Sequence, residues 1–186
     1  NRLESVDTLC PESGPLLELE EKHFNVALKD LYAEGKISLQ TYCLCKLTLV
    51  FGARPIQWSK LKINSLDVKQ LVGGKSYGLY IPWVKQSKQR RPVFFPLTQH
   101  LGAILLEQTE RVRLRFPKDT LPAGMTWDEL PLFHGVRGKA PHPPSANLIS
   151  TTIINVGRLA NIPNQREQGG SGPIAINAMR LRHTVG

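Results

Sequence analysis

Residues 52–67 read GARPIQWSKLKINSLD and place an arginine between the end of one predicted helix and the start of another. Apolar residues recur at helical spacing from Leu39 to Val50, and Gly52 can end that helix. Pro55 is tolerated in the first turn of the next one. Arg54 therefore lies beside the unpaired N–H groups of a helix start, which suits an anion. A surface arginine without any ligand would give the same local pattern.

The flanking sequence predicts a mainly helical α+β protein, with helices around a small antiparallel β-sheet or hairpin. Tyr77–Val84 and Pro92–Leu97 are rich in β-forming residues and flank the polar stretch KQSKQRR at 85–91, which predicts a hairpin. Caps, periodicity and prolines predict helices over 16–33, 39–51, from Pro55, from Thr98 to Pro117, from Ser145 to Ala160, and from near Pro173. Thr126-Trp-Asp-Glu129 has capping-box spacing.

Charge is unevenly distributed along the 186 residues. The net charge is +9, yet residues 1–34 hold eight acids and three bases, which leaves 21 of the 24 bases and 7 of the 15 acids in residues 35–186. A basic body of this size favours a polyanionic partner, most often nucleic acid. A basic protein without such a partner is the alternative.

Other signals are absent or uninformative. No apolar run is long enough for a membrane span, and residues 1–14 lack a signal-peptide pattern. Cys10, Cys43 and Cys45 lack metal-ligand spacing, so we expect reduced thiols in a cytosolic protein. The sequence has no P-loop, no dinucleotide-binding glycine motif and no zinc cluster.

Two further stretches carry basic residues in suggestive places. Residues 83–118 hold eight bases and two acids, and Lys88 would lie at the hairpin tip, where basic side chains can meet phosphates. A solvated turn is the simpler reading of that segment alone. Residues 178–186 read AMRLRHTVG, in which Met179 and Arg182 share one helix face.

Taken together, these three segments resemble the catalytic domain of the tyrosine recombinase (phage integrase) family. Gly52, Arg54 and Leu61 match the family's first motif, G-x-R-x-x-E-x-x-x-L. Lys88 stands eight residues before Pro96, as the family's hairpin lysine stands before its V/I-P-L ending. Residues 181–184, LRHT, match the last four places of H-x-L-R-H-T. The resemblance extends from about Leu16 to Gly186.

The resemblance implies a known chemistry on double-stranded DNA. A tyrosine attacks a phosphodiester, forms a 3′-phosphotyrosyl bond and releases a 5′-hydroxyl. A second hydroxyl later attacks this bond and rejoins the strand. Arg54 and Arg182 would hold the non-bridging oxygens of the phosphate. Lys88 would protonate the leaving oxygen, with Lys85 as the second candidate. The covalent intermediate removes the need for a cofactor or a metal ion.

The predicted DNA contacts outside these catalytic positions are Lys85, Arg90, Arg91, Arg180 and His183. Three places depart from the family pattern. Gln57 stands where the family has a glutamate, and it can still accept a hydrogen bond. Met179 replaces a histidine, and its thioether cannot transfer protons. His183 follows the arginine, and helix packing or a phosphate contact is a better expectation for it than catalysis.

The nucleophilic tyrosine is not expected among the chain's own tyrosines, which all precede Arg91. We therefore expect a C-terminally truncated catalytic domain over 16–186, with residues 1–15 as an arm. Such a fragment would bind DNA without cleaving it and would be mostly monomeric, whereas the parent would form a tetramer on DNA. The expected setting is the cytoplasm, on a bacterial nucleoid or encoded by a mobile element.

Two other interpretations remain open. A recombinase-like domain that has lost catalysis would only hold DNA, and Met179 favours this alternative. A basic RNA-binding or assembly protein would have no relation to the family, and convergence of Arg54, Lys88 and Arg182 around one anion-sized pocket would exclude it.

Overall fold

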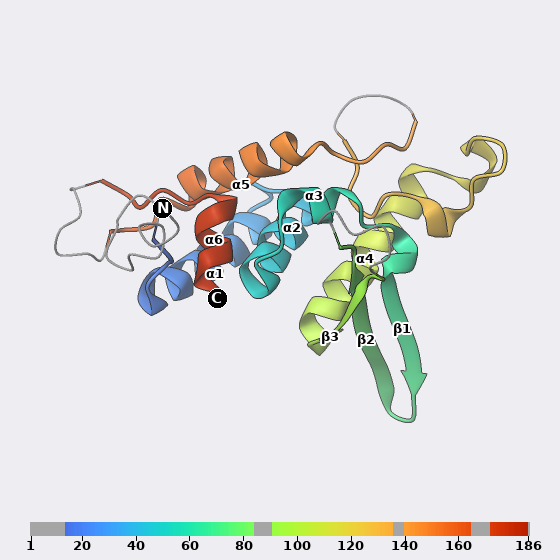
Figure 1. Ribbon diagram of the computed structural model, residues 1–186, viewed down its shortest axis with the longest axis horizontal. Coiled ribbons are helices and arrows are strands. Elements are labelled where there is room, and N and C mark those ends of the chain that lie inside the picture. The colour runs from blue at the N-terminus through green and yellow to red at the C-terminus, as the bar shows by residue number, and fades with distance from the viewer. Residues whose placement is uncertain (1–13, 84–90, 136–139, 165–171, 186) are drawn as a thin grey trace. The chain divides into compact units, whose positions relative to one another are not determined.

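The computed structural model describes residues 14–83, 91–135, 140–164 and 172–185 (Figure 1). The chain divides into two compact units. The first, here the helical unit, comprises Asn1–Pro55 and Ile149–Gly186, and the second, here the sheet unit, comprises Ile56–Leu148. A mainly helical fold with one small antiparallel sheet confirms the predicted α+β class.

The helical unit is built around α2 (Leu39–Phe51), which is apolar on nearly all sides and therefore buried. The Ser38 hydroxyl accepts a hydrogen bond from the Thr41 N–H and caps its start. At its other end Gly52 adopts φ 56°, and its N–H donates to the Thr48 carbonyl. Both ends lie where the sequence predicts them.

Within the described residues, three more helices contribute to this unit. Helix α1 (Glu18–Ala33) buries Phe24, Leu28 and Leu31, and it contacts α2. Helix α5 (Ala146–Ala160) begins at the predicted Ser145 cap, whose hydroxyl accepts from the Leu148 N–H, and buries one apolar stripe from Ile149 onward. Helix α6 (Ala178–Thr184) lies beside α2 (Figure 1).

The predicted start of the last helix near Pro173 is wrong. Ile174 and Ile176 are buried while Ala175 between them is exposed, which is the alternation of an extended chain. The Ile174 N–H donates to the Ile162 carbonyl, and Ile176 packs where any side chain at Gly157 would stand. Asn177 then caps the helix, so α6 begins at Ala178.

The sheet unit contains a three-stranded antiparallel sheet in the order β1-β2-β3. Strands β2 (Gly74–Ile81) and β3 (Val93–Leu97) pair with Tyr77 opposite Leu97 and Ile81 opposite Val93, which confirms the predicted pairing. Strand β1 (Leu66–Leu71) was not predicted. It is an exposed edge strand whose residues alternate poorly, and the turn at Gly73 joins it to β2.

Helix α4 (Gln99–Arg115), capped by Thr98 as predicted, packs against β2. Short helical segments complete the unit: α3 (Pro55–Ser59), η2 (Ile63–Ser65), η3 (Lys118–Thr120) and η4 (Trp127–Glu129). Ile63, Val112, Phe116 and Leu130 form a buried cluster between them. The predicted capping box is present, since the Glu129 carboxylate accepts from the Thr126 N–H.

Cys43 and Cys45 are buried thiols, as expected, whereas Cys10 lies outside the described residues. Burial raises the pKa of the Cys45 thiol to about 12. Among the described residues, no helix combines the length and apolar character of a membrane span. Within the same residues, no group of three or more His, Cys, Asp or Glu side chains is placed to hold a metal ion.

Candidate functional site

Arg54 is an exposed residue of the short segment that follows α2. The left-handed turn at Gly52 ends α2, and Pro55 opens α3 one residue after the arginine. A glycine adopts this positive φ without the steric cost that a side chain would bring. Local sequence therefore places Arg54 in the short connection between the end of α2 and the start of α3.

Arg182 is an exposed residue of α6. The Asn177 side chain accepts a hydrogen bond from the Arg180 N–H at 2.8 Å and fixes the start of this helix. Leu181 on the same helix is fully buried. The cap and the buried leucine together orient the helix so that Arg182 faces solvent.

The two arginine-bearing segments meet at Gly52. A Cβ atom at this glycine would stand 3.1 Å from the Arg182 carbonyl oxygen and 3.3 Å from the Arg182 Cα atom. Arg54 is two residues further along, so its Cα atom lies at most about 12 Å from that of Arg182, given 3.8 Å between consecutive Cα atoms. Two exposed arginine residues thus belong to one small region of the helical unit.

Thr184 fastens the end of α6 to the start of α1. Its hydroxyl accepts from the Leu16 N–H at 2.9 Å and donates to the Arg180 carbonyl at 3.0 Å. Sequence reasoning did not assign this role to Thr184. Because the hydroxyl has a partner on each side, it holds the turn of α6 that carries Arg182.

Arg180 is fully buried, with a relative exposure of 0%. A side chain without exposed surface cannot contact DNA unless the protein rearranges, so the structure does not support the predicted DNA contact. The prediction missed this because sequence alone does not say which side of a short helix faces the interior. His183 is partly exposed, and Met179 is 60% exposed.

The predicted hairpin residues Lys85, Lys88 and Arg90 lie outside the described residues, so their roles stay predictions. Arg91 is described and exposed, two residues before β3. In the sheet unit, the Gln57 amide donates to the Pro82 carbonyl at 2.9 Å. Gln57 therefore links α3 to the end of β2.

Part of the basic charge predicted over 83–118 is balanced on α4. Arg111 pairs with Glu107 at 2.7 Å, and Arg113 pairs with Glu110 at 3.2 Å and Asp128 at 3.7 Å. These exposed or half-exposed pairs add little stability. They do reduce the positive field of this helix, so it is a weaker candidate for phosphate binding than the sequence count indicated.

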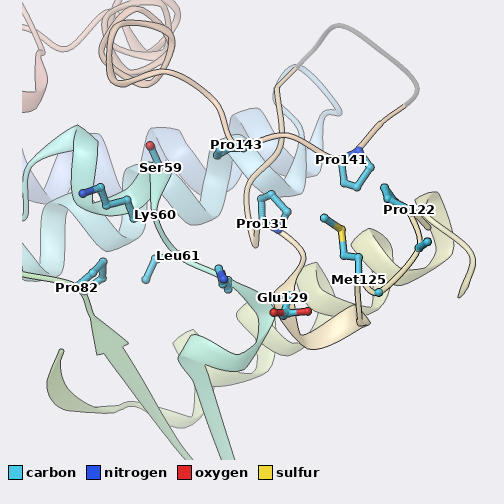
Figure 2. A pocket seen from close by; sticks show the side chains of 13 residues that line it. Ser59, Lys60, Leu61, Pro82, Pro122, Met125, Glu129, Pro131, Pro141 and Pro143 are labelled. Carbon is cyan, nitrogen blue, oxygen red and sulfur yellow. The ribbon is translucent and has the colours of Figure 1, made fainter. Parts of the chain in front are cut away.

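The sheet unit also has an apolar pocket of about 960 Å³ (Figure 2). Met125 and Glu129, from the segment around η4, and Lys60, which follows α3, line part of it. Much of the remaining lining consists of five prolines: Pro82, Pro122, Pro131, Pro141 and Pro143. Neither Arg54 nor Arg182 lines it. Its apolar lining makes it a poor site for a phosphate.

No family model and no curated protein matches this chain. Solved structures do resemble it. The crystal structure of XerA recombinase superposes with a TM-score of 0.59 at 18% identity, over 94% of this chain and 48% of that one. XerH site-specific recombinase bound to its difH substrate, before cleavage, gives 0.58 at 18% identity, over 92% of this chain and 41% of that one.

The post-cleavage complex of XerH with a palindromic difH substrate gives a TM-score of 0.58 at 19% identity, over 94% of this chain and 41% of that one. The chain thus spans less than half the length of each of these structures. At such low identity the likeness concerns the fold. The chain has a fold like that of the tyrosine recombinase catalytic domain.

Proposed function

We propose that this protein acts in site-specific DNA recombination, and that Arg54 and Arg182 bind one phosphate of the DNA backbone. The observation that carries the proposal is the close approach of the Arg182 backbone to Gly52, two residues before Arg54. Both arginines are exposed on the helical unit. Two guanidinium groups can hold the non-bridging oxygens of one phosphate through charge-assisted hydrogen bonds.

The proposed reaction is a transesterification. A tyrosine hydroxyl attacks phosphorus, the bond to the 5′-oxygen breaks, and a 3′-phosphotyrosyl ester forms. Negative charge accumulates on the non-bridging oxygens in the transition state, where Arg54 and Arg182 would stabilise it. Lys88 would give a proton to the leaving 5′-oxygen. Attack by a 5′-hydroxyl on the ester then rejoins the strand and returns the tyrosine.

The tyrosines of this chain are Tyr32, Tyr42, Tyr77 and Tyr80. None follows Arg182, where the family resemblance expects the nucleophile. For residues 1–186 we therefore propose DNA binding without cleavage, as a monomer. Cleavage, and assembly into a tetramer on DNA, are proposed for a longer protein.

Binding to labelled duplex DNA, followed by fluorescence anisotropy over a range of salt concentrations, tests the proposal. Arg54→Ala and Arg182→Ala should each weaken binding and reduce its salt dependence, because each removes a phosphate contact. Arg158→Ala, an exposed arginine of α5 in the same unit, is the matched control and should bind as the unchanged protein does. Equal affinity of all four proteins would contradict the proposal.

A second candidate is a DNA-binding module that has lost catalysis. Met179 favours it, because this 60% exposed thioether occupies the place of a histidine that transfers protons in the family. A nicked suicide substrate distinguishes the two candidates when it is mixed with a protein that carries a tyrosine after Arg182. A covalent adduct supports the recombinase, and tight binding without an adduct supports the module.

A further inference from the structure

Two opposite charges are buried in the helical unit. Glu20 of α1 and Arg180 of α6 each have 0% exposure. They are the only charged side chains among the fully buried residues of the part that the structure describes. Removing an ionised side chain from water costs several kcal/mol unless an opposite charge and hydrogen bonds compensate it. Each of these two residues therefore needs the other kind of charge nearby.

The neighbouring hydrogen bonds place the two charges in the same region. The Leu16 N–H donates to the Thr184 hydroxyl at 2.9 Å, which brings the start of α1 to the end of α6. Glu20 follows Leu16 by four residues, and Arg180 precedes Thr184 by four. Arg180 and Thr184 lie one turn apart on the same face of α6. Leu16 precedes α1, and the Glu20 carboxylate accepts from the N–H of the next residue, Leu17. Glu20 and Arg180 thus both lie near the hydrogen bond between Leu16 and Thr184, here the anchor point.

The bonds of Glu20 and Thr184 also limit where the two side chains can go. One oxygen of the Glu20 carboxylate, Oε2, accepts from the Leu17 N–H at 2.8 Å, so this side chain turns back toward the start of α1. The Thr184 hydroxyl donates to the Arg180 carbonyl at 3.0 Å, so the turn that bears Arg180 is attached to the same anchor. A carboxylate has acceptor capacity for a guanidinium as well as for this N–H.

We propose that Glu20 and Arg180 form a buried ion pair that fixes α6 on the start of α1 and thereby positions Arg182. The positioning role rests on the proposed function, whereas the ion pair does not. Arg182 lies two residues after Arg180 and two before Thr184. The ion pair and the Thr184 hydroxyl would then hold α6 on both sides of the phosphate-binding arginine.

A double-mutant cycle on the folding equilibrium tests the pair without DNA. Glu20→Gln and Arg180→Met should each lower the folding equilibrium constant by roughly a hundredfold or more, because each leaves an uncompensated buried charge. The double variant should lose much less than the product of the two single effects. Glu18→Gln and Arg158→Met, exposed residues of the same unit, are matched controls with small effects. Independent effects that multiply would overturn the pair.

If a single variant does not fold, the unchanged protein still decides the question. The Nε–H proton of Arg180 can be followed by NMR, and a guanidinium held in a buried ion pair should exchange this proton with solvent slowly. Its signal should show a nuclear Overhauser contact to the Glu20 side chain. A contact to other residues with none to Glu20 would overturn the pair.

A second measurement tests positioning. At a temperature where the variants are folded, Arg180→Lys, which keeps the charge and loses the planar fork, should weaken DNA binding several-fold. In an Arg182→Ala background, the same substitution should have almost no further effect. Equal losses in both backgrounds would overturn the positioning role and leave the ion pair intact. If Arg182→Ala itself does not change binding, the proposed function fails, whatever the folding cycle shows.

Discussion

The carbonyl oxygen of Arg182 stands 3.1 Å from the place that a Cβ atom would occupy on Gly52. Glycine is therefore favoured at position 52 for two separate reasons. Its φ of 56°, at the end of α2, is a conformation that other residues adopt only at a steric cost. The close approach of α6 leaves little room for a side chain, and it brings together the two segments that carry the proposed phosphate-binding arginines.

Replacing Gly52 by alanine should therefore destabilise the protein by more than the backbone conformation alone requires. The left-handed conformation costs a non-glycine residue about 1–2 kcal/mol. Gly35→Ala is the matched control, because Gly35 has φ 70° and nothing within 4 Å of an added Cβ atom. Urea denaturation should show a larger loss for Gly52→Ala than for Gly35→Ala. Equal losses would mean that α6 can move away from an added Cβ atom at position 52 without a cost in unfolding free energy.

Replacing Arg182 by lysine should weaken DNA binding although the charge is retained. Lysine cannot make the two parallel hydrogen bonds of a guanidinium to a phosphate. Affinity should fall by roughly tenfold, the equivalent of about 1.4 kcal/mol at 25 °C, while the slope of log affinity against log salt changes little. Arg158→Lys on α5 is the control. An unchanged affinity for Arg182→Lys would indicate a purely electrostatic contact.

Replacing Thr184 by valine should cost about 1–3 kcal/mol of unfolding free energy, because the partly buried Leu16 N–H loses its acceptor. Valine keeps the β-branched shape, so helix propensity changes little. The Leu16 amide should also exchange faster with deuterium. Thr151→Val, at an exposed position of α5, is the control. A protected Leu16 amide in Thr184→Val would contradict the anchoring role.

Replacing Gly102 by alanine should destabilise the sheet unit, although alanine is the better helix former by about 1 kcal/mol. An added Cβ atom would overlap the Tyr77 ring of β2, against which α4 packs. Overpacking of this kind typically costs about 1–3 kcal/mol. The neighbouring exposed Ala103 provides the control with the opposite substitution. Ala103→Gly should lower the unfolding free energy only by the difference in helix propensity between alanine and glycine. Thermal denaturation of both variants gives the comparison.

Acid should destabilise the sheet unit through His134. Burial lowers the pKa of this half-buried imidazole, and the positive charge of Arg115 acts in the same direction, while the Gly135 carbonyl opposes them. The unfolded chain, with a pKa near 6.5 for this histidine, then binds a proton more readily than the folded one. The stabilising contribution is present above pH 6.5 and is lost as the pH falls through the folded-state pKa.

His134→Gln should reduce this acid dependence. Urea denaturation of both proteins at pH 7.5 and pH 5 measures it, and an NMR titration of the imidazole gives the pKa directly. The stability of the unchanged protein should fall more between the two pH values than that of the variant. Parallel losses in the two proteins would assign the acid dependence to other groups.

Much of the local structure could be predicted because its determinants are close in sequence. Ser38, Thr98 and Ser145 each cap a helix through a hydrogen bond to a residue three positions later. Strand β1 and the start of α6 could not be predicted in this way. Strand β1 pairs with the next segment of the chain, but its mostly exposed residues lack the apolar alternation that indicates a strand. The extended segment before α6 depends on a more distant partner, Ile162.

In the candidate site too, some features could be predicted from sequence motifs and others depend on packing. The motif spacing identified Arg54 and Arg182, and the structure places them on adjoining segments of one unit. The burial of Arg180 and the two bonds of the Thr184 hydroxyl follow from how α6 packs on the start of α1, which no local pattern encodes. Lys88, outside the described residues, remains a prediction.

The division of the chain has a consequence for the order of folding. The helical unit is made of two stretches, and the whole sheet unit intervenes between them in sequence. Contacts between α2 and α6 therefore close a long loop, which costs chain entropy and slows folding. On a ribosome, the sheet unit is complete before α6 is synthesised. The nascent chain would thus be basic well before Arg54 and Arg182 come together, so the proposed selective binding of a phosphate would arise only after the sheet unit has been synthesised.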